Sequence, residues 1–252
     1  MSGQFPASVI AGAAGGIGSA VCRRLAAAGA RLLMVGRTAG KLESLATELR
    51  GINPSGEYLT YIADATKSAE IDAAFAKATE AFGLIHGAAN LVGSILLKPA
   101  HLTTDAEFDD TLTLNAKTAF YVVRAATKAM TAGGSIVLAS TVAATIGLTN
   151  HEAIAAAKGA VNGLVLAAAA TYAPRNIRVN AVAPGLVKTP LAARITGNEA
   201  ALKASTAMHP LGRVGEPDDV AAGVAWLLDP ATTWVTGQVI GIDGGLGRVR
   251  AR

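Results

Sequence analysis

The stretch Ser8-Val-Ile-Ala-Gly-Ala-Ala-Gly-Gly-Ile-Gly18 indicates the fold, because a short apolar run passes there into a turn that contains four glycines. The turn leads into a helix-like segment, Ile17 to Ala28. Where a strand turns directly into a helix, several backbone N–H groups stay unpaired and the helix dipole is positive. Glycine has no Cβ atom, so a phosphate can approach those N–H groups closely. We therefore predict a diphosphate site here, with tight strand–helix packing as the alternative.

The composition is typical of one α/β domain. The chain has 252 residues, 51% of them hydrophobic, and no linker, repeat or low-complexity block divides residues 1–252. No apolar run reaches the ~18 residues of a membrane span, and no signal-peptide pattern is present. Cys22 is the single cysteine and cannot form an internal disulfide, which favours a reducing, cytoplasmic compartment.

The charge pattern gives no sign of a nucleic-acid partner. The net charge is +4, but it falls to +1 without Arg248, Arg250 and Arg252 of the C-terminal tail. There is no other basic run, and aromatic residues make up 4% of the chain. We expect a small-molecule substrate and neither a nucleic acid, a membrane nor a metal ion as a partner.

Apolar strand-like runs alternate with helix-like segments along the whole chain. Such alternation predicts βαβ units, a parallel sheet and right-handed crossovers. The predicted strands are Ser8–Ala11, Arg31–Val35, Tyr58–Ala63, Leu84–Ala88, Gly134–Ala139, Ile177–Ala183 and Val239–Ile242. The predicted helices are Ile17–Ala28, Gly40–Leu49, Ala69–Phe82, Asp105–Thr131, Asn150–Ala173 and Pro217–Leu228. Thr104 with Glu107 and Thr149 with Glu152 are expected to form capping boxes, and Pro217 suits a first helical position.

The residue after the second predicted strand indicates which dinucleotide would bind. Ligands of open parallel sheets bind at the carboxyl ends of the strands. A carboxylate after this strand would pair with the ribose hydroxyls of NAD, but the chain has Gly36 and Arg37 there. A guanidinium can hold a 2′-phosphate through two hydrogen bonds. We therefore predict NADP(H) in preference to NAD(H), unless Arg37 is only a solvated arginine.

Two further strand ends carry candidate contacts. Asp64 and Ala65 follow the third strand, where Asp64 could accept a hydrogen bond from an adenine amino group or cap the turn into the next helix. Gly87-Ala-Ala-Asn90 follows the fourth predicted strand, and its small side chains would let a nucleotide pass close to the backbone. Ala88 and Ala89 are therefore included in the predicted cofactor site.

The segment after the sixth strand is expected to cover the substrate. Pro184 and Gly185 open a loop in which Val187 and Thr189 are placed to meet the far end of the cofactor. We predict that residues 186–215 form a lid of loop and helix. Its apolar residues favour a hydrophobic or weakly polar substrate, although ordinary packing explains them equally well.

Taken together, these motifs resemble the short-chain dehydrogenase/reductase (SDR) family over nearly the whole chain. Gly12-Ala-Ala-Gly-Gly-Ile-Gly18 is similar to the family's cofactor turn T-G-x-x-x-G-I-G, with Ala11 in place of the threonine. His86-Gly-Ala-Ala89 lies where we place the family's N-N-A-G, and it departs from that sequence. The later signatures are matched by Asn180-Ala-Val-Ala-Pro-Gly185, Thr236-Gly-Gln238 and Asp243-Gly-Gly245.

The resemblance implies a single-domain Rossmann-type fold, a doubly wound parallel sheet with strand order 3-2-1-4-5-6-7. It also implies a nicotinamide dinucleotide cofactor. The residues that it assigns to the cofactor are Gly12, Ala14, Gly15, Gly16, Ile17 and Gly18 at the diphosphate and Lys158 at the nicotinamide ribose.

The catalytic residues are where the chain departs most from the family. There, a serine after the fifth strand and a Y-x-x-x-K pair on the next helix perform the chemistry. Lys158 matches the lysine, but Ile154 stands at the tyrosine position and cannot donate a proton. Thr141 falls at the serine position, and its hydroxyl can still polarise a carbonyl. Asn115 resembles the helix asparagine that helps to hold a proton-relaying water. Loss of a positioned general acid lowers a rate ~10²–10⁴-fold.

His151 is the candidate for a replacement proton donor. It lies on the same helix stripe as Ile154 and Lys158. Its spacing from Lys158 resembles that of the divergent enoyl-acyl-carrier reductases, in which a tyrosine stands further from the lysine than in the rest of the family. If Thr149 caps the helix, however, the dipole disfavours a charged imidazole in the first turn, and an exposed histidine is the simpler interpretation.

Three functions follow from these features. The first is an NADP(H)-dependent oxidoreductase that acts on a carbonyl/alcohol pair or an activated double bond and takes its proton from water or His151. The second is a redox-inactive NADP(H)-binding scaffold or sensor, as Ile154 suggests. The third is a lyase or isomerase on the same scaffold. Small residues along the helix from Asn150 to Ala173 predict a homodimer or homotetramer through close helix packing.

Overall fold

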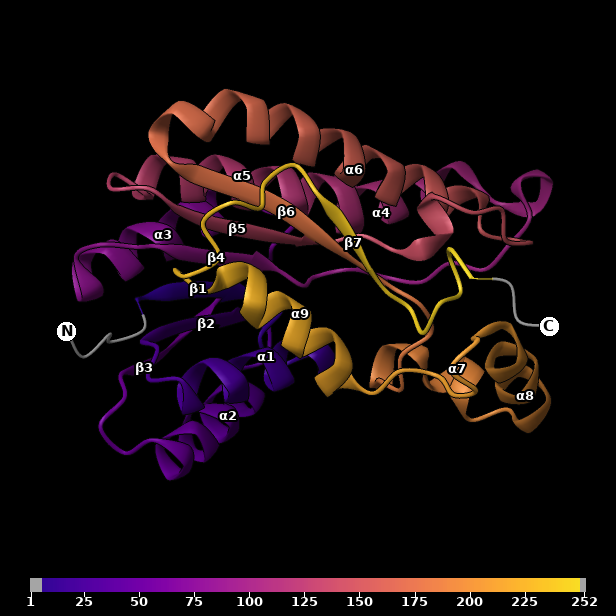
Figure 1. Ribbon diagram of the computed structural model, residues 1–252, viewed down its shortest axis with the longest axis horizontal. Coiled ribbons are helices and arrows are strands. Elements are labelled where there is room, and N and C mark those ends of the chain that lie inside the picture. The colour runs from indigo at the N-terminus through magenta and orange to yellow at the C-terminus, as the bar shows by residue number, and fades with distance from the viewer. Residues whose placement is uncertain (1–5, 250–252) are drawn as a thin grey trace.

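The computed structural model describes residues 6–249, so Arg250 and Arg252 of the basic tail lie outside the described residues. Seven parallel strands form one sheet in the order β3-β2-β1-β4-β5-β6-β7, which confirms the predicted topology. Figure 1 shows α1, α2 and α9 below this sheet and α4, α5 and α6 above it. The strand order reverses beside β1, so a crevice opens there at the carboxyl edge of the sheet.

The predicted strands are all present, with small shifts at their ends. They are β1 (Ser8–Ala11), β2 (Leu32–Gly36), β3 (Tyr58–Ile62), β4 (Gly87–Asn90), β5 (Gly134–Ala139), β6 (Ile177–Pro184) and β7 (Val239–Ile242). The α-helices are α1 (Gly16–Ala27), α2 (Ala39–Ile52), α3 (Ser68–Phe82), α4 (Asp105–Leu112), α5 (Thr118–Ala129), α6 (Glu152–Tyr172), α7 (Ala193–Thr196), α8 (Glu199–Met208) and α9 (Pro217–Leu228). The short turns are η1 (Ala100–Leu102), η2 (Thr113–Lys117), η3 (Val142–Ala144), η4 (Ala173–Arg175) and η5 (Pro190–Ala192).

The apolar strands bury both of their faces, as parallel strands between two helical layers do. Val9 of β1 belongs to the core under α3, α5 and α6, whereas its neighbour Ile10 belongs to the core under α1, α2 and α9. Successive side chains of a strand point to opposite faces, and each face here meets an apolar helix stripe. β1 pairs with β2 on one side and β4 on the other, which places the glycine turn that follows it at the middle of the sheet edge.

Of the three helix-start signals predicted from the sequence, two are confirmed and one is wrong. Thr104 caps α4 in a reciprocal capping box with Glu107, and Pro217 is the first residue of α9. Thr149 and Glu152 form no such box, because α6 begins at Glu152 with His151 as its N-cap. Asn150, predicted as helical, adopts a left-handed φ of 63°, and its carbonyl oxygen accepts a hydrogen bond from Lys98 N at 2.9 Å.

The helix predicted for Asp105–Thr131 is divided in the structure. A π-helical turn, η2, separates α4 from α5. Asn115 lies in this turn, and its side-chain Nδ2 donates to the carbonyl oxygen of Thr111 at 2.9 Å. A side chain that bonds a carbonyl four residues earlier competes with the helical backbone, and π turns are frequent at functional sites.

Among the described residues, one helical stretch, Glu152–Arg175, is long and apolar enough to cross a membrane by length and composition alone. Its most apolar window of 18 residues has a mean hydropathy of 1.6 and is 44% buried. Polar residues interrupt this window, so it contains no continuous apolar run of 18 residues. The stretch contains α6, which packs on β6 and supplies Val161 and Val165 to the core. Its apolar character is that of a core helix.

Candidate functional site

The glycine turn between β1 and α1 brings the backbone of the cleft together. Gly12 has a left-handed φ of 79°, and a Cβ atom there would lie 2.9 Å from the backbone of Leu91. A Cβ on Gly18 would overlap the carbonyl oxygen of Gly12. Both positions therefore require glycine, and the turn presents bare backbone to the space above it.

The first turn of α1 is open to an anion. Gly15 is its N-cap, and among the described residues no side chain caps it and no acidic residue stands in its first turn. The unpaired N–H groups and the helix dipole suit a phosphate at this end. Thr189 lies directly over the turn, because a Cβ on Gly16 would come within 2.8 Å of its Cγ2 atom. This contact places the start of the 186–215 segment above the glycine turn.

A cleft of about 480 Å³ runs along the carboxyl edge of the sheet and contains most of the residues predicted for the cofactor. These are Gly12, Ala14, Gly15, Gly16, Ile17, Gly18, Arg37, Asp64, Ala65 and Thr189. The wall after β2 carries two cations, since Lys41 joins Arg37 there and both side chains are exposed. Sequence reasoning missed Lys41 because it lies on α2, although its spacing of four residues from Arg37 was visible.

Asp64 fills the local role expected of a turn residue. Its Oδ1 accepts hydrogen bonds from Thr66 N at 3.0 Å and Thr66 Oγ1 at 2.8 Å. These bonds, together with the charges of Arg37 and Lys67, hold the pKa of the Asp64 carboxyl below its usual range. The carboxylate is therefore ionised and faces the same cleft as Arg37.

The prediction for Ala88 and Ala89 was wrong. Both lie inside β4 and are 0% exposed, because the strand begins at Gly87 and ends at Asn90, later than predicted. The residues that line the cleft after this strand are Leu91 to Ser94. Asn90-Leu-Val-Gly93 also carries the first and last residues of the N-N-A-G sequence, which had been placed four residues too early.

Lys158, Asn115 and Gly93 meet at the inner end of the cleft. Lys158 is 6% exposed and Asn115 is 0% exposed, although they come from α6 and the π turn. A Cβ atom on Gly93 would lie 3.4 Å from Lys158 Nζ and 2.8 Å from Asn115 Oδ1. Lys158 Nζ donates to the carbonyl oxygen of Ala139 at 2.7 Å. Burial lowers the pKa of Lys158 from its ordinary 10.5 to about 8.

Ser94 lines the cleft and was not singled out from the sequence. Its hydroxyl accepts a hydrogen bond from Asn115 Nδ2 at 2.9 Å, and its backbone N donates to Asn115 Oδ1 at 3.2 Å. These two bonds attach the loop after β4 to the π turn. The position of Gly93 beside Lys158 depends on this attachment.

Thr141 and Ile154 occupy the places where a hydroxyl and a phenol were sought. The Thr141 hydroxyl accepts from Ala143 N at 3.3 Å and donates to the carbonyl oxygen of Pro184 at 3.4 Å, a long bond. Ile154 is 5% exposed. His151 stands at the N-cap of α6, where its Nδ1 donates to the carbonyl oxygen of Thr149 at 2.7 Å.

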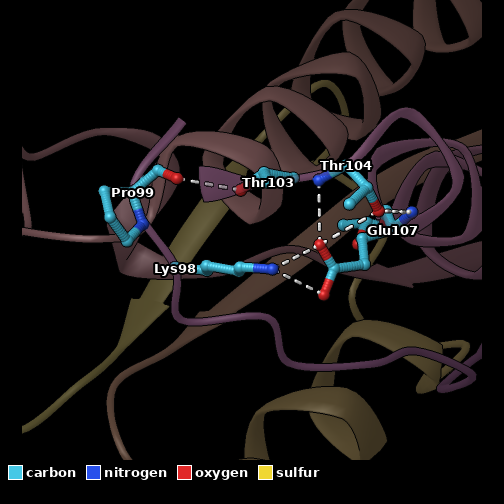
Figure 2. A network of polar contacts seen from close by, with 6 residues as sticks. Lys98, Pro99, Thr103, Thr104 and Glu107 are labelled. Carbon is cyan, nitrogen blue, oxygen red and sulfur yellow. Dashed lines mark hydrogen bonds and ion pairs between the residues drawn. The ribbon is translucent and has the colours of Figure 1, made fainter. Parts of the chain in front are cut away.

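A polar network fixes the loop that carries Gly93 and Ser94. Figure 2 shows the Lys98 ammonium between the two oxygens of Glu107, at 2.9 and 2.7 Å. Glu107 Oε2 also accepts from Thr104 N at 2.9 Å. Lys98 above all, and then Thr104 N, lower the pKa of Glu107 to about 2. Because Lys98 N also bonds Asn150, the network joins α4, the loop after β4 and the start of α6.

The remaining predicted contacts lie near the start of the 186–215 segment. Pro184 ends β6, Val187 is buried in the core, and Gly185 lines a second hollow of about 330 Å³. His209 at the end of α8 is 3% exposed; its Nδ1 donates to Ser205 O at 2.6 Å and its Nε2 accepts from Leu186 N at 3.2 Å. The histidine therefore attaches α8 to the loop after β6.

A larger hollow, of about 870 Å³, lies at the opposite edge of the sheet. His86, Gly134 and Ile177, at or next to the amino ends of β4, β5 and β6, line it. Ligands of open parallel sheets bind at the carboxyl ends of the strands. The smaller cleft that contains Lys41 and Gly93 is therefore the candidate site.

Comparison with known proteins shows the family of the chain and agrees with its fold. A protein-family model described as "Enoyl-(Acyl carrier protein) reductase" matches residues 12–247. The chain is 36% identical over 244 residues to a galactitol 2-dehydrogenase (L-tagatose-forming) of Cereibacter sphaeroides, which covers 94% of this chain and 93% of that one. The chain belongs to the short-chain dehydrogenase/reductase family.

Two solved structures show the same fold. A short-chain type dehydrogenase/reductase from Mycobacterium ulcerans superposes with a TM-score of 0.94 at 33% identity, covering 99% of this chain and 92% of that one. A variant of actinorhodin polyketide ketoreductase, solved with NADPH, superposes with a TM-score of 0.91 at 29% identity over 99% of this chain and all of the other. The family comprises oxidoreductases that use a nicotinamide cofactor.

Proposed function

We propose that the protein is an NADP(H)-dependent oxidoreductase that transfers a hydride to or from a carbonyl/alcohol pair or an activated double bond. The observation that carries this proposal is one cleft that is lined by an uncapped helix N-terminus, two cations and Gly93, with Lys158 and Asn115 directly behind Gly93. A bound nicotinamide would supply or accept the hydride. Thr141 would polarise the substrate oxygen, and Asn115 would order the polar groups around Lys158.

The residues present fit a dinucleotide with a 2′-phosphate. Backbone N–H groups at Gly16 and Ile17 suit the diphosphate, whereas the Gly15 N–H already donates to the carbonyl oxygen of Gly12 at 3.0 Å. A Cβ at the glycines of this turn would intrude on the backbone or on Thr189. Arg37 and Lys41 both line the wall after β2, where a 2′-phosphate would lie. Charge-assisted hydrogen bonds to phosphate favour NADP(H) over NAD(H) there.

A redox-inactive scaffold is the second candidate, and Ile154 favours it. The isoleucine is buried at the place where the family has its proton donor, so cofactor could bind without reaction. The direct test adds NADPH, shows binding by fluorescence, and then follows the loss of NADPH absorbance with ketones, quinones and enones. Turnover of any of these carbonyl compounds supports the oxidoreductase. Binding without turnover over the whole panel supports the scaffold.

Three finer proposals accompany this function. Residues 186–215 act as a substrate lid, because Thr189 and Leu191 line the cleft and His209 attaches α8 to the loop after β6. The protein forms a homodimer or homotetramer through α5 and α6, whose Phe120 and Leu166 are 51% and 62% exposed. It works in the cytoplasm on a small molecule. A sedimentation experiment that returns only monomer at micromolar concentration would reject the oligomer.

A further inference from the structure

We propose that Lys158 itself is the proton donor of the reaction, in the place of the tyrosine that Ile154 replaces. This inference rests on the proposed function. A bound reduced nicotinamide dinucleotide would supply the hydride, with one C–H bond broken on the cofactor and one formed on the carbonyl carbon, and the Lys158 ammonium would give a proton to the carbonyl oxygen. One N–H bond breaks and one O–H bond forms, and the neutral amine then regains a proton from water.

The position of Lys158 makes it available for this transfer. One of its three N–H donors goes to the carbonyl oxygen of Ala139 at 2.7 Å, and the other two have no hydrogen-bond partner among residues 6–249. Nζ lies 3.4 Å from the point where a Cβ on Gly93 would stand, and Gly93 lines the cleft. The free N–H groups are therefore beside the inner end of the cleft.

The surroundings of Lys158 make its proton mobile near neutral pH. Burial is the cause of the lowered pKa of about 8, and no charged side chain among the described residues opposes it. β5 and η3 carry no ionisable residue, and Asn115 is neutral. Several charged residues on the other elements packed against α6 are exposed, namely Lys117, Lys128, Asp105, Asp109 and Asp110. The others have partners of their own. Glu107 pairs with Lys98 and Arg124 with Asp72, while Arg175 and Arg178 donate to carbonyl oxygens that include those of Thr127 and Leu227. On α6 itself, Glu152 is exposed at its first residue.

The other ionisable residues of the cleft lie too far away. Among the described residues that line it, these are Arg37, Lys41 and Asp64, which stand beyond β2 and β3. β2 and β5 are separated by β1 and β4, so roughly 14 Å lies between them at ordinary strand spacing. His151 is two helical turns from Lys158, roughly 10 Å along α6, and its Nδ1 is engaged by Thr149. Thr141 and Ser94 offer only neutral hydroxyls of high pKa.

The deciding substitution is Lys158→Arg, because arginine keeps the positive charge but does not release its proton. We expect the variant to bind NADPH within a few-fold of wild type and to lose ketone turnover by ~10²-fold or more. Lys117→Arg, the same change on the exposed face of the π turn, is the matched control. Turnover of Lys158→Arg at the wild-type rate would overturn the inference.

Three further measurements separate this role from a structural one. Wild-type turnover in the reductive direction should fall as pH rises through about 8, and His151→Ala should keep that profile. The double variant Ile154→Tyr/Lys158→Arg should turn over ketones at least about tenfold faster than Lys158→Arg alone, because the phenol supplies the proton. Lys158 would be rejected as the donor if His151→Ala no longer showed the fall in turnover near pH 8. It would also be rejected if the phenol introduced by Ile154→Tyr gave no increase in turnover.

A readout without substrate completes the test. The cofactor-free protein is labelled with acetic anhydride at several pH values, and the labelled sites are located by peptide mass spectrometry. The labelling rate of Lys158 should reach half of its maximum near pH 8. A midpoint at the ordinary lysine value would reject the inference even if turnover is found. Wild-type protein that binds NADPH but reduces nothing would reject the proposed function and this role with it. Turnover that survives Lys158→Arg rejects only the role of Lys158.

Discussion

Lys158 Nζ donates a 2.7 Å hydrogen bond to the carbonyl oxygen of Ala139, the last residue of β5. This bond places a buried ammonium where the sheet ends, close to Gly93 of the candidate cleft. Lysine is seldom buried without a carboxylate partner, because desolvation disfavours its charged form. The fold therefore holds an energetically unfavourable group at its candidate site, which is the usual mark of a functional residue.

We predict that Lys158→Met stabilises the cofactor-free protein at neutral pH by about 3 kcal/mol. The pKa of Lys158 is about 8 in the folded state and 10.5 in the unfolded chain. Below pH 8 the lysine is charged in both states, and its burial then destabilises the folded state in full. Between pH 8 and 10.5 only the unfolded chain keeps the proton. Wild-type stability should therefore rise between pH 8 and 10.5, and the advantage of methionine should vanish above that range. Urea unfolding at several pH values measures both. A constant difference at all pH values would contradict the lowered pKa.

We predict that Glu107→Gln lowers the melting temperature by a few degrees at pH 6. The pKa of Glu107 is about 2, so its carboxylate stabilises the folded state above its ordinary pKa of 4.5. That contribution is lost as the pH falls through 2, and the two proteins should converge there. Glu80→Gln, at an exposed helical pair with Lys77, is the control and should have a smaller effect. Equal melting temperatures of wild type and Glu107→Gln at pH 6 would show that the network in Figure 2 does not support the loop.

We predict that Arg37→Asp weakens NADPH binding by about 10- to 100-fold and NADH binding far less. A charge-assisted hydrogen bond to phosphate contributes about 1.5–3 kcal/mol, and NADH lacks that phosphate. Lys41→Ala should show the same selectivity with a smaller loss. Fluorescence titration with both cofactors measures the ratio, and Lys77→Asp on the exposed side of α3 controls for net charge. Unchanged NADPH affinity in Arg37→Asp would remove the phosphate assignment.

We predict that Gly18→Ala destabilises the protein by about 1–3 kcal/mol and weakens dinucleotide binding more than tenfold. The new methyl group overlaps the carbonyl oxygen of Gly12, a backbone atom that cannot move without opening the turn. Gly51→Ala is the matched control, since nothing lies within 4 Å of its Cβ position on α2. That change should be neutral or stabilising by about 0.5–1 kcal/mol. Equal stabilities of the two variants would contradict the close approach of Gly18 and Gly12.

The limits of sequence reasoning are visible at β4. A strand made of Gly87, Ala88, Ala89 and Asn90 carries no periodic apolar signal, so its end was predicted too early. Its position is decided by pairing with β1 and β5, which are distant in the sequence. The start of α6 was missed for a similar reason, because Asn150 is held out of the helix by a bond from Lys98.

The sequence by itself determined the alternation of strands and helices and the glycine turn at Gly12 to Gly18, because apolar period and the absence of Cβ atoms act locally. The order of the strands was expected only from the resemblance to a known family. It also determined that Ile154 precedes Lys158 by one helical turn. Only the tertiary structure decided that Gly93, Asn115 and Lys158 meet, since they come from a loop, a π turn and a helix. Burial of the lysine, and with it the pKa that suits it to move a proton, is a property of that assembly.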